Sequence, residues 1–100
     1  AEELSSRIKN GSAPIILDVR EDFELEISKI SGSKHIPMNQ IPDRINELDP
    51  NMDYVVICRT GVRSSQICEF LSNQNFQSIA NLSGGINEWA KQIDSNMQVY

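Results

Sequence analysis

Short apolar runs separated by stretches of helical spacing constrain the fold of this chain more than any other feature of its sequence. The clearest run covers residues 54–57, which all favour β-structure, and a second follows Pro14 at residues 15–17. Weaker strand patterns cover residues 34–36 and 78–85. This alternation predicts right-handed crossovers and a small, largely parallel sheet with helices on both faces, which is an α/β fold.

Helical patterns fill the intervals between these runs. The expected helices lie within residues 1–11, 20–30, 39–50, 63–76 and 86–93. In the third of these, Ile41, Ile45 and Leu48 share one helical face, and Pro50 ends the pattern.

The length and charge of the chain exclude several classes of protein. We expect one domain over residues 1–100, because this length is that of a single domain. Fourteen acidic against nine basic side chains, without a basic run, argue against a nucleic-acid partner. No apolar stretch approaches the roughly 20 residues of a membrane helix, so no membrane partner is expected. The two cysteines and one histidine match no zinc spacing, so we expect no metal, and free thiols favour a cytoplasmic location.

The segment CRTGVRS, residues 58–64, carries the chemistry. It follows the clearest strand, so we expect it at the carboxyl edge of the sheet, where ligands bind in such folds. Gly61 permits a sharp turn, and the amides after it open the next helix and can form a nest for an anion. Arg59 and Arg63 add positive charge, and no acidic residue lies between positions 54 and 68. These features predict that Cys58 is an exposed nucleophile with a lowered pKa.

Four motifs of this sequence resemble those of the rhodanese family. The segment 58–64 is similar to the family's Cys-x-x-Gly-x-Arg-Ser/Thr active-site loop. ILDVRE (16–21), ISGSKHIP (30–37) and LSGGINEW (82–89) resemble its first strand motif, its Ile-Pro-Gly-Ala segment and its Leu-x-Gly-Gly signature before the last helix. The motifs occur in the family's order and span nearly the whole chain. The resemblance implies a rhodanese fold with a five-stranded, mostly parallel sheet.

The same resemblance implies a sulfurtransferase that needs no cofactor. The catalytic Cys58 thiolate would attack a sulfane sulfur, hold it as a persulfide and pass it to a nucleophilic acceptor, in the ping-pong manner of thiosulfate:cyanide rhodaneses. The donor would be thiosulfate or the persulfide of a cysteine desulfurase. The loop amides would hold the outer sulfur or the anionic end of the donor, and a guanidinium suits two oxygens of an oxyanion. The implied substrate-binding residues are Arg59, Thr60, Gly61, Val62, Arg63 and Ser64.

The carboxyl-terminal segment is similar to one branch of the family. WAKQIDSNMQVY (89–100) resembles the tail of proteins that join an adenylating enzyme to a rhodanese module, although Ser95 and Gln98 stand here where prolines are usual. ISKISGS (27–33) lacks the Gly-His pair of many stand-alone rhodaneses. The resemblance implies a module excised from a longer protein with an adenylating domain before it. Its sulfur acceptor would be the C-terminus of a ubiquitin-like sulfur carrier in molybdopterin or thiamine biosynthesis or tRNA thiolation.

Two other functions stay open, and a third fails. The chain could be a stand-alone thiosulfate sulfurtransferase, or a catalytically idle rhodanese module that binds proteins. The intact Cys58 and Arg63 argue against the idle module, because degenerate modules commonly lose the cysteine. Dual-specificity phosphatases need His before the cysteine and Arg six positions after it, whereas Ile57 precedes Cys58 and the arginine follows five positions later.

Several residues outside the loop are expected to have supporting roles. Asp18 and Arg20 match the family's strand-end motif and are expected to pair and to fix the loops around the site. Cys68 lies on an apolar helical face and is expected in the core, with a redox partnership to Cys58 as the alternative. His35 is expected to be a scaffold residue rather than a general base.

Overall fold

The computed structural model describes residues 2–99, and four parallel strands form its centre. The strands are β1 (Ile15–Asp18), β2 (Lys34–His35), β3 (Asp53–Ile57) and β4 (Ser78–Asn81). The α-helices are α1 (Glu2–Lys9), α2 (Asp22–Ile27), α3 (Val62–Asn73) and α4 (Gly85–Gln92). Two short 3-10 helices are η1 (Met38–Gln40) and η2 (Ile45–Glu47).

The sheet has the order β2-β1-β3-β4, with every pair parallel. Asp18 lies opposite Ile57, and Val56 lies opposite Asn81, so the carboxyl ends of β1, β3 and β4 meet at one edge. The α/β class and the parallel sheet are confirmed. The expected number of five strands is wrong for residues 2–99, which contain four.

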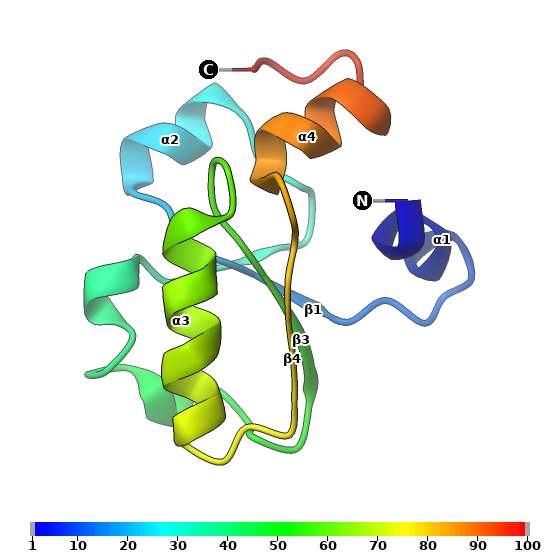
Figure 1. The fold of residues 1–100 in the computed structure, drawn as a ribbon. Helices are drawn as coiled ribbons and strands as arrows, with labels where there is room; N and C mark the ends of the chain where they lie inside the picture. Colours follow the sequence, from blue (N-terminus) through cyan, green and yellow to red (C-terminus); the bar gives the residue numbers. More distant parts are fainter. Residues whose placement is uncertain (1, 100) are drawn as a thin grey trace.

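Helices cover both faces of the sheet, as the sequence predicts (Figure 1). Along β3 the side chains alternate: Tyr54 and Val56 enter the core shared with α3, while Val55 and Ile57 enter the core shared with α1 and α4. Position 58 continues the first series, so Cys58 points to the α3 side.

The helix expected within residues 39–50 is wrong. The segment forms η1, a turn and η2 instead, because Pro42 has no N–H to bond the carbonyl of Met38. Arg44 then leaves helical geometry, with a φ of −113° and a ψ of 14°. The apolar residues still reach the core, where Ile41 is 0% and Leu48 5% exposed.

None of the helices among residues 2–99 has the length and apolar character needed to cross a membrane.

Candidate active site

Cys58 lies directly after the central strand and is buried. Only 1% of the residue is exposed, which corrects the expectation of an exposed thiol. The cause is the alternation of β3, which turns position 58 into the core under α3. The sulfur therefore lies at the base of the 58–64 loop, and a reagent must reach it through that loop.

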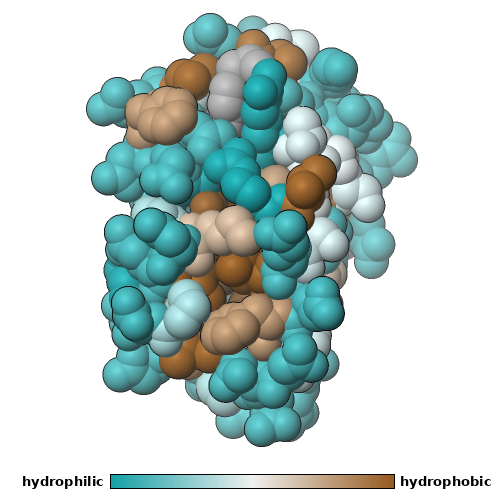
Figure 2. Space-filling model, turned by 60° about the vertical axis from the view of Figure 1, so that its left-hand side comes forward, coloured by the Kyte–Doolittle hydropathy of each residue, from teal (hydrophilic) through white to brown (hydrophobic). Residues whose placement is uncertain are grey.

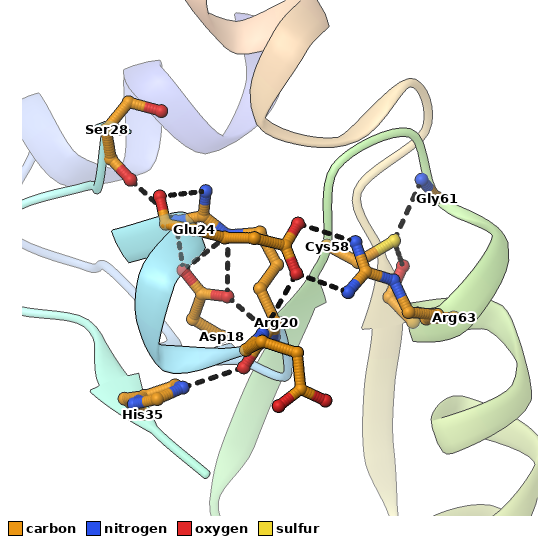
Figure 3. A network of polar contacts seen from close by, with 10 residues as sticks. Asp18, Arg20, Glu24, Ser28, His35, Cys58, Gly61 and Arg63 are labelled. Atoms are coloured by element: carbon orange, nitrogen blue, oxygen red, sulfur yellow. Dashed lines mark hydrogen bonds and ion pairs between the residues drawn. The ribbon is translucent and has the colours of Figure 1, made fainter. Parts of the chain in front are cut away.

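The loop closes around the Cys58 sulfur. The Gly61 amide donates a hydrogen bond to Sγ at 3.0 Å (Figure 3). The Ser64 hydroxyl lies 3.3 Å from the same sulfur. Gly61 has a φ of +103°, a conformation that side chains with a Cβ rarely adopt. This turn aims the amide inward immediately before α3 begins.

These donors lower the pKa of Cys58. Burial acts first and in the opposite direction, because desolvation favours the neutral thiol. The Ser64 hydroxyl and the backbone amides of Ser64, Gly61 and Thr60 outweigh it, since each hydrogen bond stabilises the thiolate. Hydrogen bonds from the loop thus act on the thiolate in the direction that the sequence predicts.

Arg63 points to a carboxylate rather than standing free in the loop. Its two terminal nitrogens lie 2.6 and 2.8 Å from the two oxygens of Glu24, so the ion pair is bidentate (Figure 3). Glu24 is buried, and its carboxylate also accepts a hydrogen bond from the Glu21 amide in a capping box at the start of α2. The pair ties α2 to the loop and neutralises the arginine.

Asp18 and Arg20 form a fully buried ion pair at the end of β1. The Arg20 guanidinium also donates to the backbone carbonyls of Glu24 and Ser28, at 3.3 and 2.8 Å. His35 Nε2 lies 2.7 Å from the carbonyl oxygen of Arg20 and thus contacts this scaffold. The network fixes α2, and α2 in turn presents Glu24 to Arg63.

Asn81, at the end of β4, supports the loop from the opposite side. Its Nδ2 donates to the Gly61 carbonyl at 3.1 Å, and its Oδ1 accepts a hydrogen bond from the Ser64 hydroxyl. Sequence reasoning missed Asn81 and Glu24. A polar residue at the carboxyl end of a parallel strand was a usable signal for Asn81. Nothing local marks Glu24, whose partner lies 39 positions away.

The rim of the loop is exposed and partly apolar. Arg59, Thr60 and Val62 are exposed, and Val62 is 66% accessible. A hollow of about 420 Å³ adjoins Arg63 on the α3 side, where Figure 2 shows apolar side chains gathered among hydrophilic ones. Its apolar lining comes from Met38, Pro42, Ile67 and Phe70.

The second cysteine differs from the first in its chemistry. Cys68 is half-buried against the α3-side core, and burial, followed by the charge of Cys58, raises its pKa to about 11. Both thiols are free. Within residues 2–99, no group of three or more potential ligands could hold a metal ion.

We expect iodoacetamide to distinguish the two thiols by their pH profiles. The rate follows the thiolate, so a lowered pKa places the midpoint for Cys58 below 9.0, and that for Cys68 near 11. Mass spectrometry of alkylated peptides between pH 6 and 11, with Cys58→Ser and Cys68→Ser as single-thiol controls, measures the Cys58 midpoint and shows whether the Cys68 rate is still rising at pH 11. Coincident midpoints would contradict the hydrogen-bond argument.

The chain is similar to known proteins in both sequence and structure. The family model for the rhodanese-like domain matches residues 1–92. A protein of Allochromatium vinosum named "Sulfurtransferase" is 35% identical over 91 residues, which cover 91% of this chain and 85% of that protein. "Probable adenylyltransferase/sulfurtransferase MoeZ" of Mycobacterium tuberculosis is 32% identical over 98% of this chain, which spans only 26% of MoeZ. The crystal structure of a rhodanese-like domain protein from Staphylococcus aureus superposes with a TM-score of 0.85 at 31% identity, over 99% of this chain and 93% of that one. The chain belongs to the rhodanese-like domain family.

Proposed function

We propose that this domain is a sulfurtransferase that carries sulfane sulfur as a persulfide on Cys58. The observation that carries the proposal is the set of loop amides and the Ser64 hydroxyl around the Cys58 sulfur, which stabilise a thiolate. The thiolate attacks the outer sulfur of thiosulfate, and an S–S bond forms at Sγ. The S–S bond of thiosulfate breaks, and sulfite leaves with the bonding electron pair. A nucleophilic acceptor then takes the outer sulfur and restores the thiolate.

The names of the relatives support sulfur transfer but do not identify the sulfur acceptor. We infer that the acceptor is the C-terminus of a ubiquitin-like sulfur carrier, and that the donor in the cell is a cysteine-desulfurase persulfide. MoeZ combines adenylyltransferase and sulfurtransferase in its name, which is the pairing that such a carrier requires. The exposed side chains of Val62 and Phe23, and separately the apolar lining of the hollow next to Arg63, suit a protein acceptor better than a small ion. Two free thiols agree with a reducing, cytoplasmic location.

Intact-protein mass spectrometry after incubation with thiosulfate tests the proposal. We expect one added sulfur atom per chain, which cyanide removes as thiocyanate. The same experiment with a cysteine desulfurase and cysteine tests the second donor. If neither donor adds sulfur, the proposed sulfurtransferase activity is wrong, and a module that only binds proteins is favoured.

We propose that Arg63 has two roles: it pairs with Glu24, and it binds the anionic sulfur donor. Two variants separate the structural role from the binding role. Arg63→Ala removes the bidentate guanidinium from the buried Glu24 carboxylate, so we expect the free energy of unfolding to fall by about 2 kcal/mol. Adding Glu24→Gln removes the buried negative charge and should restore most of that loss. If Arg63 binds thiosulfate, the KM in the double variant stays raised by about tenfold, the value of one charged hydrogen bond. A KM that recovers together with stability would leave Arg63 with the structural role alone.

A further inference from the structure

The Ser64 hydroxyl has one proton and two acceptors within reach. One acceptor is the Cys58 sulfur, 3.3 Å away, and the other is Asn81 Oδ1. A hydroxyl can donate only one hydrogen bond at a time. The direction of this proton therefore decides which partner Ser64 stabilises.

The orientation of the Asn81 amide is determined by its other contact. Nδ2 lies 3.1 Å from the Gly61 carbonyl, and a carbonyl accepts only from a donor. Oδ1 must therefore face Ser64, where it accepts the hydroxyl proton. In this arrangement the lone pairs of the Ser64 oxygen face Cys58, which suits a thiol S–H donating to Ser64.

Loss of the Cys58 proton reverses the direction of the hydrogen bond between Cys58 and Ser64. A thiolate has no hydrogen to donate and is stabilised by each donor that reaches it, so the Ser64 hydroxyl adds to the donating backbone amides only when it turns from Asn81 to the sulfur. Asn81 Oδ1 then loses its hydrogen bond. The side chain of Asn81 thus competes directly with the Cys58 thiolate for a single proton.

We propose that Asn81 is a positioning residue that governs the reactivity of Cys58 by competing for the Ser64 hydroxyl. This inference deepens the proposed function and rests on it, because it takes Cys58 as the nucleophile. It adds a residue from β4, on the far side of the loop from Arg63 and Glu24.

The native ionisable groups around the sulfur are the same in every variant of the test, so they cancel in the comparison. They are Arg59 in the loop, Arg63 on α3, Glu24 on α2, and the Asp18–Arg20 pair at the end of β1, while Cys68 on α3 is replaced by serine throughout.

The test compares Asn81→Leu with Asn81→Asp. Both lose the donor to the Gly61 carbonyl, so any loosening of the loop is shared. Leucine removes the acceptor and frees the hydroxyl for the sulfur, whereas a carboxylate holds that proton more strongly. We expect the Cys58 pKa, measured from the pH profile of iodoacetamide alkylation in a Cys68→Ser background, to be at least about one pH unit lower in Asn81→Leu than in Asn81→Asp.

The same two Asn81 variants are then measured in a Ser64→Ala background. This separates the effect of the Ser64 hydroxyl from the direct effect of the carboxylate charge in Asn81→Asp. We expect the gap between the two Asn81 variants to shrink by at least about half, since the competed proton is gone. An unchanged gap would overturn the proposal, because the effect would then bypass Ser64. If Asn81→Leu does not fold, Asn81→Ala replaces it, and Asn73→Leu and Asn73→Asp at the exposed end of α3 serve as matched controls. Alkylation needs no sulfur transfer, so failure of this inference and failure of the proposed reaction are separate results.

Discussion

Replacing Cys58 by serine is expected to abolish sulfur uptake, with a loss of at least about 10³-fold in thiosulfate:cyanide turnover. A serine hydroxyl stays protonated at neutral pH and forms no persulfide, whereas the loop amides and Ser64 lower the pKa of the cysteine. Intact-protein mass spectrometry after thiosulfate treatment and a thiocyanate assay measure the two quantities.

Cys68→Ser is the matched control for this experiment. The two residues carry the same functional group, but Cys68 lies on α3 with a pKa raised to about 11. We expect the control to load one sulfur atom at close to the wild-type rate. Sulfur found on the Cys58→Ser protein, or lost in the control, would assign the persulfide to Cys68 instead. Circular dichroism should show that both variants remain folded, because serine is slightly smaller than cysteine and Cys58 already lies among hydrogen-bond donors.

Replacing Gly85 by alanine is expected to lower the free energy of unfolding by about 2–4 kcal/mol. A Cβ at this position would lie 2.4 Å from the Arg59 carbonyl oxygen and 2.5 Å from that of Cys58, and both are backbone atoms that no rotamer change can move aside. The first amides of α4 bond these same two carbonyls, from Ile86 to Cys58 at 2.9 Å and from Asn87 to Arg59 at 3.2 Å. An added methyl group would therefore push α4 away from the 58–64 loop.

Gly32→Ala controls for backbone conformation in this prediction. Gly32 has a φ of +82°, against +62° for Gly85, but nothing lies within 4 Å of its added Cβ. Its alanine variant carries only the conformational cost, about 1 kcal/mol. Urea unfolding of both variants separates the two contributions. Equal losses of unfolding free energy in the two variants would mean that the close approach of α4 to the loop contributes nothing to stability. An unchanged rate of sulfur loading in Gly85→Ala would show that α4 does not position Cys58.

Much of the fold was predictable because its signals are local. Residues 54–57 are apolar β-formers and become the central strand, and the helical pattern after Gly61 becomes α3. The segment around Pro42 was misread, because the spacing of its apolar residues is helical while its proline cannot complete the hydrogen-bond ladder. The fifth strand came from the family resemblance and has no counterpart among the described residues.

The sequence by itself determined the order of the elements and put Cys58, Gly61 and Ser64 in one loop, because a strand followed by a tight turn and a helix is specified by adjacent residues. Tertiary structure decided the burial of Cys58 and the pairing of Arg63 with Glu24. It also decided the contact of Asn81 with Ser64. These features join segments 17 to 39 positions apart, or depend on which face of the sheet a side chain enters. The pKa of the Cys58 sulfur combines both levels: burial, which the packing of the sheet decides, raises it, and hydrogen bonds from the neighbouring loop residues Thr60, Gly61 and Ser64 lower it.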